Sequence, residues 1–370
     1  MTDDFDVLRQ PLTLGALELP NRLVMAPLTR NRADDDGTAN ALMAEYYGQR
    51  AASAGLIVSE ATWVSQQGKP YPRTPGIATD AHRDGWRLVT DAVHAKGGRI
   101  VAQLWHGGRI GHPDTSGEPL VSASDVGPGE LTIFTPTEAA ASIPAPRALS
   151  LDEIPAVIGD FADAATRAIE AGFDGVEVHG ANGYLLQQFL SDNTNHRDDA
   201  YGGSPENRAR FVGELTTAVV EAIGAERVGI RLSPLAPAHE MAESDGGDTY
   251  RALASTLAPL GLAYVHLLAQ PEDALTAELR TAFGAPLLLN TGFSKHTERE
   301  EAISFVADGH ADAPVVGRAF IANPDLYERW SQKAPQNETL SKLFYAGGPE
   351  GYTDYPTLDD GEAETALGTA

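Results

Sequence analysis

The stretch "VEVHGANGYLLQQFLS" (176–191) joins an apolar run to an amphipathic one through a strongly polar turn. The apolar residues before His179 favour a buried strand, and the Leu/Gln/Phe pattern after Tyr184 favours a helix. His179, Asn182 and Tyr184 lie between them, although a plain βα connection needs no imidazole, amide or phenol. The stretch therefore predicts a βα unit whose turn carries a functional site.

The same βα unit recurs along the whole chain. Short apolar runs predict eight strands, at 23–28, 56–60, 99–104, 175–178, 228–232, 264–268, 286–290 and 314–316. Longer amphipathic stretches predict a helix after each, at about 38–53, 80–96, 152–170, 205–223, 248–259, 272–282, 296–307 and 323–332. Because the strands are apolar on both faces and alternate with helices, we expect a closed (β/α)₈ TIM barrel.

Three segments stand outside this repeat. Residues 11–22 predict a hairpin that closes the bottom of the barrel, with Gly15 in its turn. Residues 106–149, rich in Gly, Pro and Ser, predict a long insertion after the third strand. The tail 357–370 is acidic and rich in small residues, so we expect disorder there and a single barrel domain over 1–356.

Composition restricts the classes of partner. The chain has 370 residues, with 27 Lys and Arg against 52 Asp and Glu and a formal net charge of −25. Such a surface repels nucleic acid and anionic membranes, so we expect neither as a partner; simple solubility is the alternative reading of the charge. The N-terminal residues resemble no signal peptide and no run of eighteen apolar residues occurs, so we expect a cytoplasmic monomer or small homo-oligomer.

The residue types also restrict the chemistry. With no cysteine, disulfides, thiolate–metal sites and a Cys nucleophile are excluded. The strand ends carry no cluster of His and carboxylates of the kind that binds a metal, and the sequence contains no phosphate-binding P-loop. A redox reaction would therefore depend on a bound cofactor.

In a parallel barrel the chemistry gathers at the carboxyl ends of the strands. Gly292, Gly317 and Arg318 follow the last two strands, which is the usual phosphate-binding position of this fold. Glycines that only form left-handed turns are the alternative. Arginine beside the second glycine favours a phosphate.

Arg231 lies among apolar residues at the end of the fifth strand. A guanidinium inside a barrel needs an anion or several acceptors, and a structural ion pair with Glu60 or Glu177 is the alternative to a ligand. Gln103 and Thr29 add an amide and a hydroxyl at the ends of other strands. Together they suit a flat heterocycle with N–H and C=O edges.

Several segments, in order along nearly the whole chain, resemble the old yellow enzyme family of flavin-dependent ene-reductases on a (β/α)₈ barrel. They are "LPNRLVMAPLTRNRA" (19–33), "QLWHGGR" (103–109), "HGANGYLLQQFLSDNTNHRDDAYGGSPENRARF" (179–211), "GRAFIANPDL" (317–326) and "GGPEGYTDYP" (347–356). The resemblance implies non-covalent FMN, reduced by NADPH or NADH, that passes hydride to an activated alkene.

The resemblance also implies roles for particular residues around the cofactor. Thr29 would lie near flavin O4; the Thr there, in a chain without cysteine, indicates the classical branch. Arg231 would lie near flavin N1 and O2. The remaining implied cofactor residues are Pro27, Ala61 and Gln103 beside the ring, and Gly292, Gly317 and Arg318 at the phosphate.

On the substrate side, the resemblance implies that His179 and Asn182 bind a carbonyl or nitro oxygen and that Tyr184 donates a proton. The alternative for all three is a structural role, in which their hydrogen bonds are made within the protein. Tyr71, Trp105 and Tyr345 match aromatic positions around the substrate. The implied substrates are small activated alkenes, including enones, enals, maleimides and nitroalkenes, with nitrate esters also open.

Two segments match no pattern of the family: the loop 233–250, and the insertion, where an Ile133–Phe134 pair is placed to fold over the substrate. Two other classes also compete. An aldolase or isomerase would need a lysine or a base carboxylate at a strand end, and Lys69, Lys96, Lys295, Lys333 and Lys342 are poorly placed. A non-catalytic flavin- or ligand-binding protein would not need the His179, Asn182 and Tyr184 set.

Overall fold

The computed structural model describes residues 4–292 and 296–360. Its centre is a closed parallel barrel of eight strands, in which each strand pairs with the next one along the chain, including β6 with β11. The ring closes because β15 pairs with β3, with Val315 opposite Val24. The barrel strands are β3 (Val24–Met25), β4 (Leu56–Val58), β6 (Ile100–Trp105), β11 (Gly175–Gly180), β12 (Val228–Leu232), β13 (Tyr264–Leu268), β14 (Leu287–Asn290) and β15 (Ala313–Val316). The predicted TIM barrel is confirmed.

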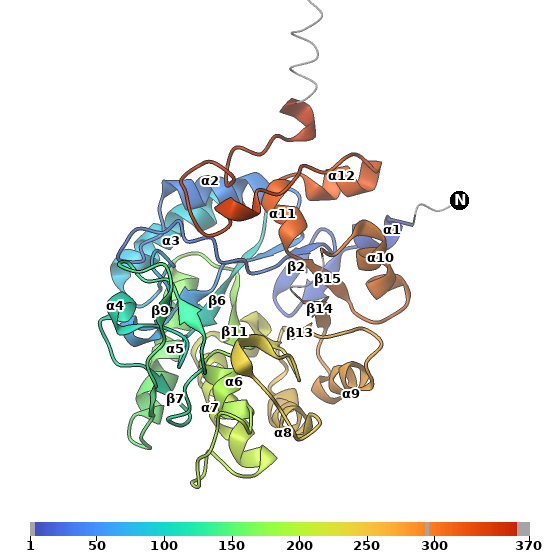
Figure 1. Cartoon of the computed structure of the whole chain (residues 1–370). Helices are drawn as coiled ribbons and strands as arrows, with labels where there is room; N and C mark the ends of the chain where they lie inside the picture. Colours follow the sequence, from blue (N-terminus) through green and yellow to red (C-terminus); the bar gives the residue numbers. More distant parts are fainter. Residues whose placement is uncertain (1–3, 293–295, 361–370) are drawn as a thin grey trace, which may run out of the picture.

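Helices surround the strands (Figure 1). They are α2 (Ala41–Arg50), α3 (Asp80–His94), α5 (Ile154–Glu170), α7 (Pro205–Ile223), α8 (Asp248–Leu257), α9 (Ala274–Phe283), α10 (Arg299–Ala307) and α12 (Leu326–Gln332). Each corresponds to a predicted helix, with starts up to three residues later than predicted. The short helix α6 (Leu185–Leu190) is the helix indicated by the Leu/Gln/Phe pattern after Tyr184. The short α1 (Asp6–Arg9) and α11 (Arg318–Ala322) were not predicted as separate helices.

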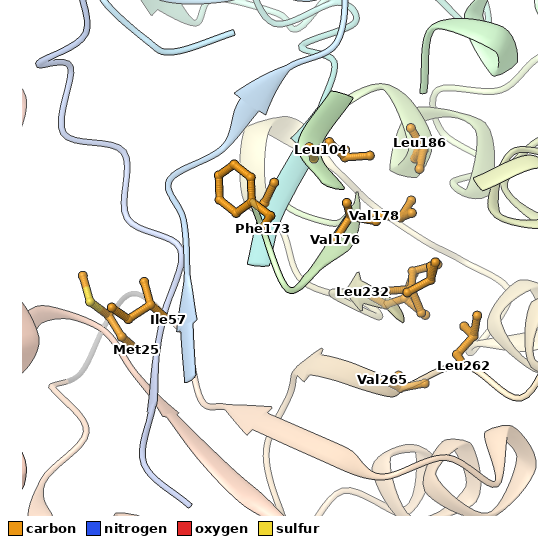
Figure 2. Close-up of a cluster of buried hydrophobic side chains, with 14 of the residues drawn as sticks. Met25, Ile57, Leu104, Phe173, Val176, Val178, Leu186, Leu232, Leu262 and Val265 are labelled. Carbon is orange, nitrogen blue, oxygen red and sulfur yellow. The ribbon is translucent and has the colours of Figure 1, made fainter. Parts of the chain in front are cut away.

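The apolar core has two layers. The outer layer fills the space between the strands and the helices; Figure 2 shows part of it, including Met25, Ile57 and Leu104. The inner layer lies inside the barrel and includes Val58 and Leu288. Because alternate residues of a strand face opposite sides, strands apolar on both faces supply both layers.

A hairpin of β1 (Leu12–Leu14) and β2 (Leu17–Leu19) closes the inner layer at the bottom, as predicted. Leu14 and Leu17 belong to the same buried cluster as the barrel interior. Gly15 turns the hairpin at φ +58°, and a Cβ there would overlap the carbonyl oxygen of Glu226. Only glycine fits this position.

The first barrel strand is shorter than the predicted 23–28 and contains only Val24–Met25. The Ala26 N–H still bonds to the Val316 carbonyl oxygen at 2.9 Å, but Pro27 has no N–H to extend the ladder. The chain leaves the sheet there and runs along the barrel mouth.

The insertion after β6 holds a short helix and two small sheets. The helix is α4 (Pro113–Ser116); β7 (Val121–Ser122) pairs with β10 (Arg147–Ala148), and β8 (Thr132–Ile133) pairs with β9 (Ala141–Ser142). A further short strand, β5 (Thr62–Trp63), pairs with β6.

At the other end of the chain, the Leu358 N–H donates to Asp325 at 2.7 Å. The rest of the predicted disordered tail, 361–370, lies outside the described residues.

Candidate active site

A cavity of about 630 Å³ opens at the carboxyl ends of the barrel strands. This volume lies in the range of about 300–1,000 Å³ that is usual for sites of small molecules and cofactors. All fourteen site residues predicted from the sequence line it: Pro27, Thr29, Ala61, Tyr71, Gln103, Trp105, His179, Asn182, Tyr184, Arg231, Gly292, Gly317, Arg318 and Tyr345. The fold therefore brings together residues from seven strand ends and from the C-terminal segment.

The end of β11 and the turn that follows it present His179, Asn182 and Tyr184 to this cavity. Asn182 has φ +59° and Gly183 has φ +79°, so two successive residues adopt the left-handed conformation. Asn tolerates this region better than most residues with a Cβ, and glycine adopts it freely. The sharp turn allows three side chains within six residues to face one space.

Hydrogen bonds from outside the turn hold its backbone in this conformation. The Asn182 N–H donates to Ser233 Oγ at 2.9 Å, and the Gly183 N–H donates to Gln187 Oε1 at 2.7 Å. The Ser233 hydroxyl also donates to Gln187 Oε1, at 3.0 Å. Gln187 in turn contacts Glu243 and Tyr250. Ser233 and Glu243 lie in the loop after β12, Gln187 lies in α6 and Tyr250 lies in α8. Their hydrogen bonds to one another support the turn rigidly.

His179 is neutral in this environment. Burial lowers the pKa of its imidazole well below the usual value, and the positive charge of Arg231 lowers it further. Its Nδ1 is buried without a hydrogen-bond partner among the described residues, and so is Oδ1 of Asn182. Unpaired buried polar atoms are costly, which indicates that these side chains are arranged for a ligand rather than for the protein interior.

Tyr184 keeps its proton. Burial raises the pKa of its phenol well above 10, and the neighbouring Tyr71 raises it further. The two hydroxyl oxygens are 3.3 Å apart. Trp105 meets the Tyr184 ring edge to face at 4.9 Å, while Phe134 stacks on Tyr71 at 5.4 Å. The insertion residue Phe134 thus completes an aromatic wall on this side of the cavity.

Arg231 lies on the cavity floor, with only 4% of its surface exposed. Its Nε is buried without a partner, and no carboxylate of the described residues forms a salt bridge with its guanidinium. The alternative of a direct ion pair is therefore wrong. Glu60 instead accepts hydrogen bonds from the Arg30 N–H and the Tyr47 hydroxyl, and Glu177 bonds to Gln103 and His266.

Gly292, Gly317 and Arg318 lie across the cavity, after β14 and β15. Gly292 has φ +108°, a conformation that L residues rarely adopt. Its N–H donates to Asn290 Oδ1 at 3.0 Å, and Asn290 anchors the turn by donating to the Val315 carbonyl at 2.8 Å. Lys295 lies outside the described residues, and no lysine is among the described residues that line the cavity.

The sequence reasoning missed several residues of the cavity wall. The most notable is His239, in the loop 233–250 that matched no pattern. Its Nδ1 is 2.7 Å from the Asn182 carbonyl oxygen, and its ring lies 5.1 Å from that of Tyr184. The only available signal was its place after a barrel strand. The other missed residues are Ala26, Leu28, Asn31, Ala238, Asn290, Thr297, Ile321 and Phe344.

Two kinds of feature are absent from residues 4–292 and 296–360. No group of three or more His, Asp or Glu side chains there could hold a metal ion. No helix in that part of the chain is long and apolar enough to cross a membrane.

The fold and the cavity define a class of protein. The barrel mouth offers a buried cation and an amide on one side, a glycine-rich turn with an arginine on the other, and a neutral imidazole beside a protonated phenol above. Such a site suits a barrel enzyme that works with an aromatic, phosphate-bearing cofactor.

Known proteins agree with this class. The profile of the NADH:flavin oxidoreductase / NADH oxidase family matches residues 7–337. The chain is 41% identical over 370 residues to 12-oxophytodienoate reductase 1 of Oryza sativa subsp. japonica, covering 96% of this chain and 94% of the relative. It is also 41% identical over 376 residues to flavin oxidoreductase hxnT of Emericella nidulans, covering 94% and 96%.

Solved structures give the same result. The old yellow enzyme homologue from Zymomonas mobilis superposes with a TM-score of 0.89 at 41% identity, covering 95% of this chain and 99% of that one. Morphinone reductase superposes with a TM-score of 0.90 at 44% identity, covering 96% and 97%. The chain belongs to the NADH:flavin oxidoreductase / NADH oxidase family, as a flavin-dependent ene-reductase of the old yellow enzyme type.

Proposed function

We propose that the cavity binds FMN without a covalent link and that the side chains above it bind a small activated alkene. The observation that supports this most is the buried guanidinium of Arg231, which faces the cavity without an anionic partner in contact. A buried unpaired cation is costly unless a ligand supplies acceptors and negative charge. The oxygen-rich edge of a flavin would supply both.

The residues around the cavity fit the two ends of this cofactor. Pro27, Thr29, Ala61 and Gln103 would line the ring, and Arg231 would lie at the edge where charge accumulates on reduction. Gly292, Gly317 and Arg318 would surround the phosphate, and the Arg318 guanidinium would pair with it. When bound, FMN would supply the hydride-transfer chemistry between a reduced nicotinamide and the β-carbon of the alkene.

His179 and Asn182 would bind the carbonyl or nitro oxygen of the substrate. Since His179 is neutral, its cavity-side nitrogen can carry a proton and donate it in a hydrogen bond, as can the Asn182 amide. Negative charge grows on that oxygen during the reaction. Two fixed donors stabilise it, and each is worth about 3–4 kcal/mol when well placed.

Tyr184 would protonate the α-carbon. Its raised pKa keeps the phenol protonated at neutral pH, and its hydroxyl faces the cavity beside the two oxygen-binding residues. The Tyr71 hydroxyl at 3.3 Å is placed to return a proton to it afterwards. General acid catalysis of this kind contributes about 10²–10⁴-fold to the rate.

For the substrate we propose flat enones and related alkenes. The aromatic wall of Tyr71, Trp105 and Phe134 suits planar molecules, and Tyr345 stands at the exposed rim. The relatives named 12-oxophytodienoate reductase and morphinone reductase support an enone. Nitro compounds offer an equivalent oxygen to the same two donors, His179 and Asn182. That the protein acts on nitrate esters, that it is a monomer or small homo-oligomer and that it is cytoplasmic stay predictions.

For the reductant we propose NADH or NADPH, bound in the same cavity after the product leaves. A solved structure of morphinone reductase in complex with tetrahydroNAD supports a nicotinamide as a ligand of this kind of barrel. The direct test of the proposed function is a redox cycle of the purified protein. Either nicotinamide should reduce the bound flavin, and an enone such as cyclohexenone should oxidise it again; a protein that holds no FMN would overturn the proposal.

A further inference from the structure

Below the cavity floor, a buried chain of polar groups crosses the inside of the barrel. Gln103 Nε2 donates to Glu177 Oε1 at 2.7 Å, and Glu177 Oε2 lies 3.0 Å from Nδ1 of His266. The exposed fractions of these three side chains are 1%, 0% and 0%. Gln103 and Glu177 lie side by side in the pairing of β6 with β11. Of the three, only Gln103 also lines the cavity.

Gly229 makes room for a further buried polar side chain near this chain. Gly229, on β12, lies beside Glu177 of β11 and beside Tyr264 of β13. A Cβ at Gly229 would overlap the Tyr264 ring. The Tyr264 hydroxyl is fully buried, and its pKa is raised well above 10 by burial and by the charge of Glu177. Protonated Tyr264 and the carboxylate therefore share one enclosed space.

The carboxylate of Glu177 is ionised although it is fully buried. Burial alone would raise its pKa, but the hydrogen bonds from His266 and Gln103 and the positive charge of Arg231 together lower it below the usual value. His266 itself is kept neutral, mainly because burial lowers its pKa. Nδ1–H of His266 is thus a neutral donor, and the chain holds one negative charge near the positive charge of Arg231.

An ionised carboxylate fixes the orientation of the amide beside it. A carboxylate only accepts hydrogen bonds, so Gln103 must turn its NH₂ group toward Glu177. Its carbonyl oxygen is left for the cavity side. The floor of the cavity therefore offers one acceptor at Gln103 and one cationic donor at Arg231, a pattern that matches a ring N–H next to a ring carbonyl.

We propose that Glu177 is a positioning residue for the flavin: it holds the Gln103 amide with its oxygen toward the cavity, and its charge offsets part of the charge of Arg231. It thereby raises the affinity for FMN and lowers the reduction potential of the bound cofactor. This inference rests on the proposed placement of FMN over Gln103 and Arg231. No contact of Glu177 with substrate or cofactor is required.

Replacing the carboxylate by an amide reverses both effects. In Glu177→Gln, the neutral His266 still donates to the new side-chain oxygen, so the new NH₂ group faces Gln103. This NH₂ group can only donate, and it therefore needs the Gln103 carbonyl oxygen as its acceptor. The Gln103 amide then flips and presents its NH₂ to the cavity. The charge of Arg231 is also no longer offset, which favours the more negative, reduced flavin.

The experiment measures FMN affinity and midpoint potential rather than turnover. Apoprotein is titrated with FMN, and the loaded protein is titrated spectroelectrochemically. We expect Glu177→Gln to weaken FMN binding about tenfold and to raise the potential by about 30 mV, which is a tenfold change in a two-electron equilibrium. The matched control is Glu60→Gln, a buried carboxylate of the same barrel that does not contact Gln103. It should leave both quantities unchanged.

Two further variants separate the two effects and cover a folding failure. Glu177→Asp keeps the charge but is one methylene too short to reach Gln103, so affinity should fall without a rise in potential. In a Gln103→Leu background, Glu177→Gln should raise the potential but no longer change the affinity. A folded Glu177→Gln with wild-type affinity and an unchanged or lower potential overturns the inference, as does a Glu177→Asp with wild-type affinity. If the wild-type apoprotein binds no FMN, the proposed function itself has failed.

Discussion

At the residue scale, the function depends on how the environment sets the protonation state of each side chain. His179 and Tyr184 lie in one buried cavity, and burial disfavours the charged form of each, so it shifts their pKa values in opposite directions. It keeps the imidazole deprotonated and the phenol protonated. A neutral donor for an oxygen and a proton donor for a carbon therefore coexist at neutral pH.

Tyr184→Phe tests the acid role. The phenyl ring should keep the packing against Trp105, so reduction of the flavin by NADH or NADPH should be nearly normal. Oxidation by cyclohexenone should slow by about 10²–10⁴-fold, because the α-carbon loses its proton donor. Stopped-flow absorbance separates the two half-reactions. Tyr71→Phe, which removes the neighbouring hydroxyl, should have a much smaller effect, and equal slowing of both half-reactions in Tyr184→Phe would contradict the assignment.

The sequence indicated these residues because their types are unusual at a strand end and because their spacing resembles a known family. It could not indicate His239 in the same way. That side chain reaches the site from a loop with no periodicity, through φ +52° at His239 and φ +62° at Glu240. Which loop residue enters a cavity depends on contacts far apart in the sequence, such as His239 with Asn182.

At the element scale, the turn 181–184 is held by Ser233, which directly follows β12, and by Gln187 of α6. Ser233 receives the Asn182 N–H, and Gln187 receives the Gly183 N–H. Both acceptors are fully buried. The position of the oxygen-binding residues therefore depends on elements that never touch the substrate.

Ser233→Ala tests this support. The buried Asn182 N–H loses its acceptor, which should lower the free energy of unfolding by about 1–3 kcal/mol. Binding of p-hydroxybenzaldehyde, followed by its charge-transfer band with the flavin, should weaken because Asn182 loses its fixed position. Ser255→Ala removes a hydroxyl that bonds only within the exposed face of α8 and should change neither quantity. Unchanged phenol binding in Ser233→Ala would contradict this, because it would show that the turn keeps its conformation without the hydrogen bond to Ser233.

Long elements were well predicted from the sequence, and very short ones were not. The bounds of α7, β12 and β13 agree with the predicted ranges because each has a clear apolar pattern and definite ends. The two-residue strands of the insertion have no period to detect, since they exist only where partners pair. The first barrel strand was predicted too long because apolar character continues past Pro27, where the hydrogen-bond ladder does not.

At the scale of the whole molecule, the buried histidines make stability depend on pH. Burial lowers the pKa of His82, His106, His179 and His266. Below about pH 6.5 the unfolded chain therefore binds protons that the folded protein refuses. Stability is present above that pH and is lost as the pH falls. Glu60, with a pKa raised to about 7, takes up a proton on folding in the same range and offsets one of them.

His106→Asn tests this dependence. The pKa of His106 is lowered to about 3, so it alone should contribute a loss of about 1.4 kcal/mol for each pH unit below about pH 6. Asn can still accept the Gly108 N–H that bonds to Nδ1 at 3.0 Å. Urea unfolding between pH 7.5 and 5 should show a shallower loss of stability in the variant. An identical pH slope in the two proteins would contradict the assignment.

One anaerobic redox cycle tests most directly whether this protein is an FMN-dependent ene-reductase. The purified protein should show the absorbance of an oxidised flavin, which denaturation releases as free FMN. Added NADH or NADPH should bleach that absorbance, and one equivalent of cyclohexenone should restore it with formation of cyclohexanone. With a nicotinamide deuterated at the transferred position, the deuterium should appear at the β-carbon. A flavin that is bleached but not restored by any enone or nitroalkene would contradict the central claim.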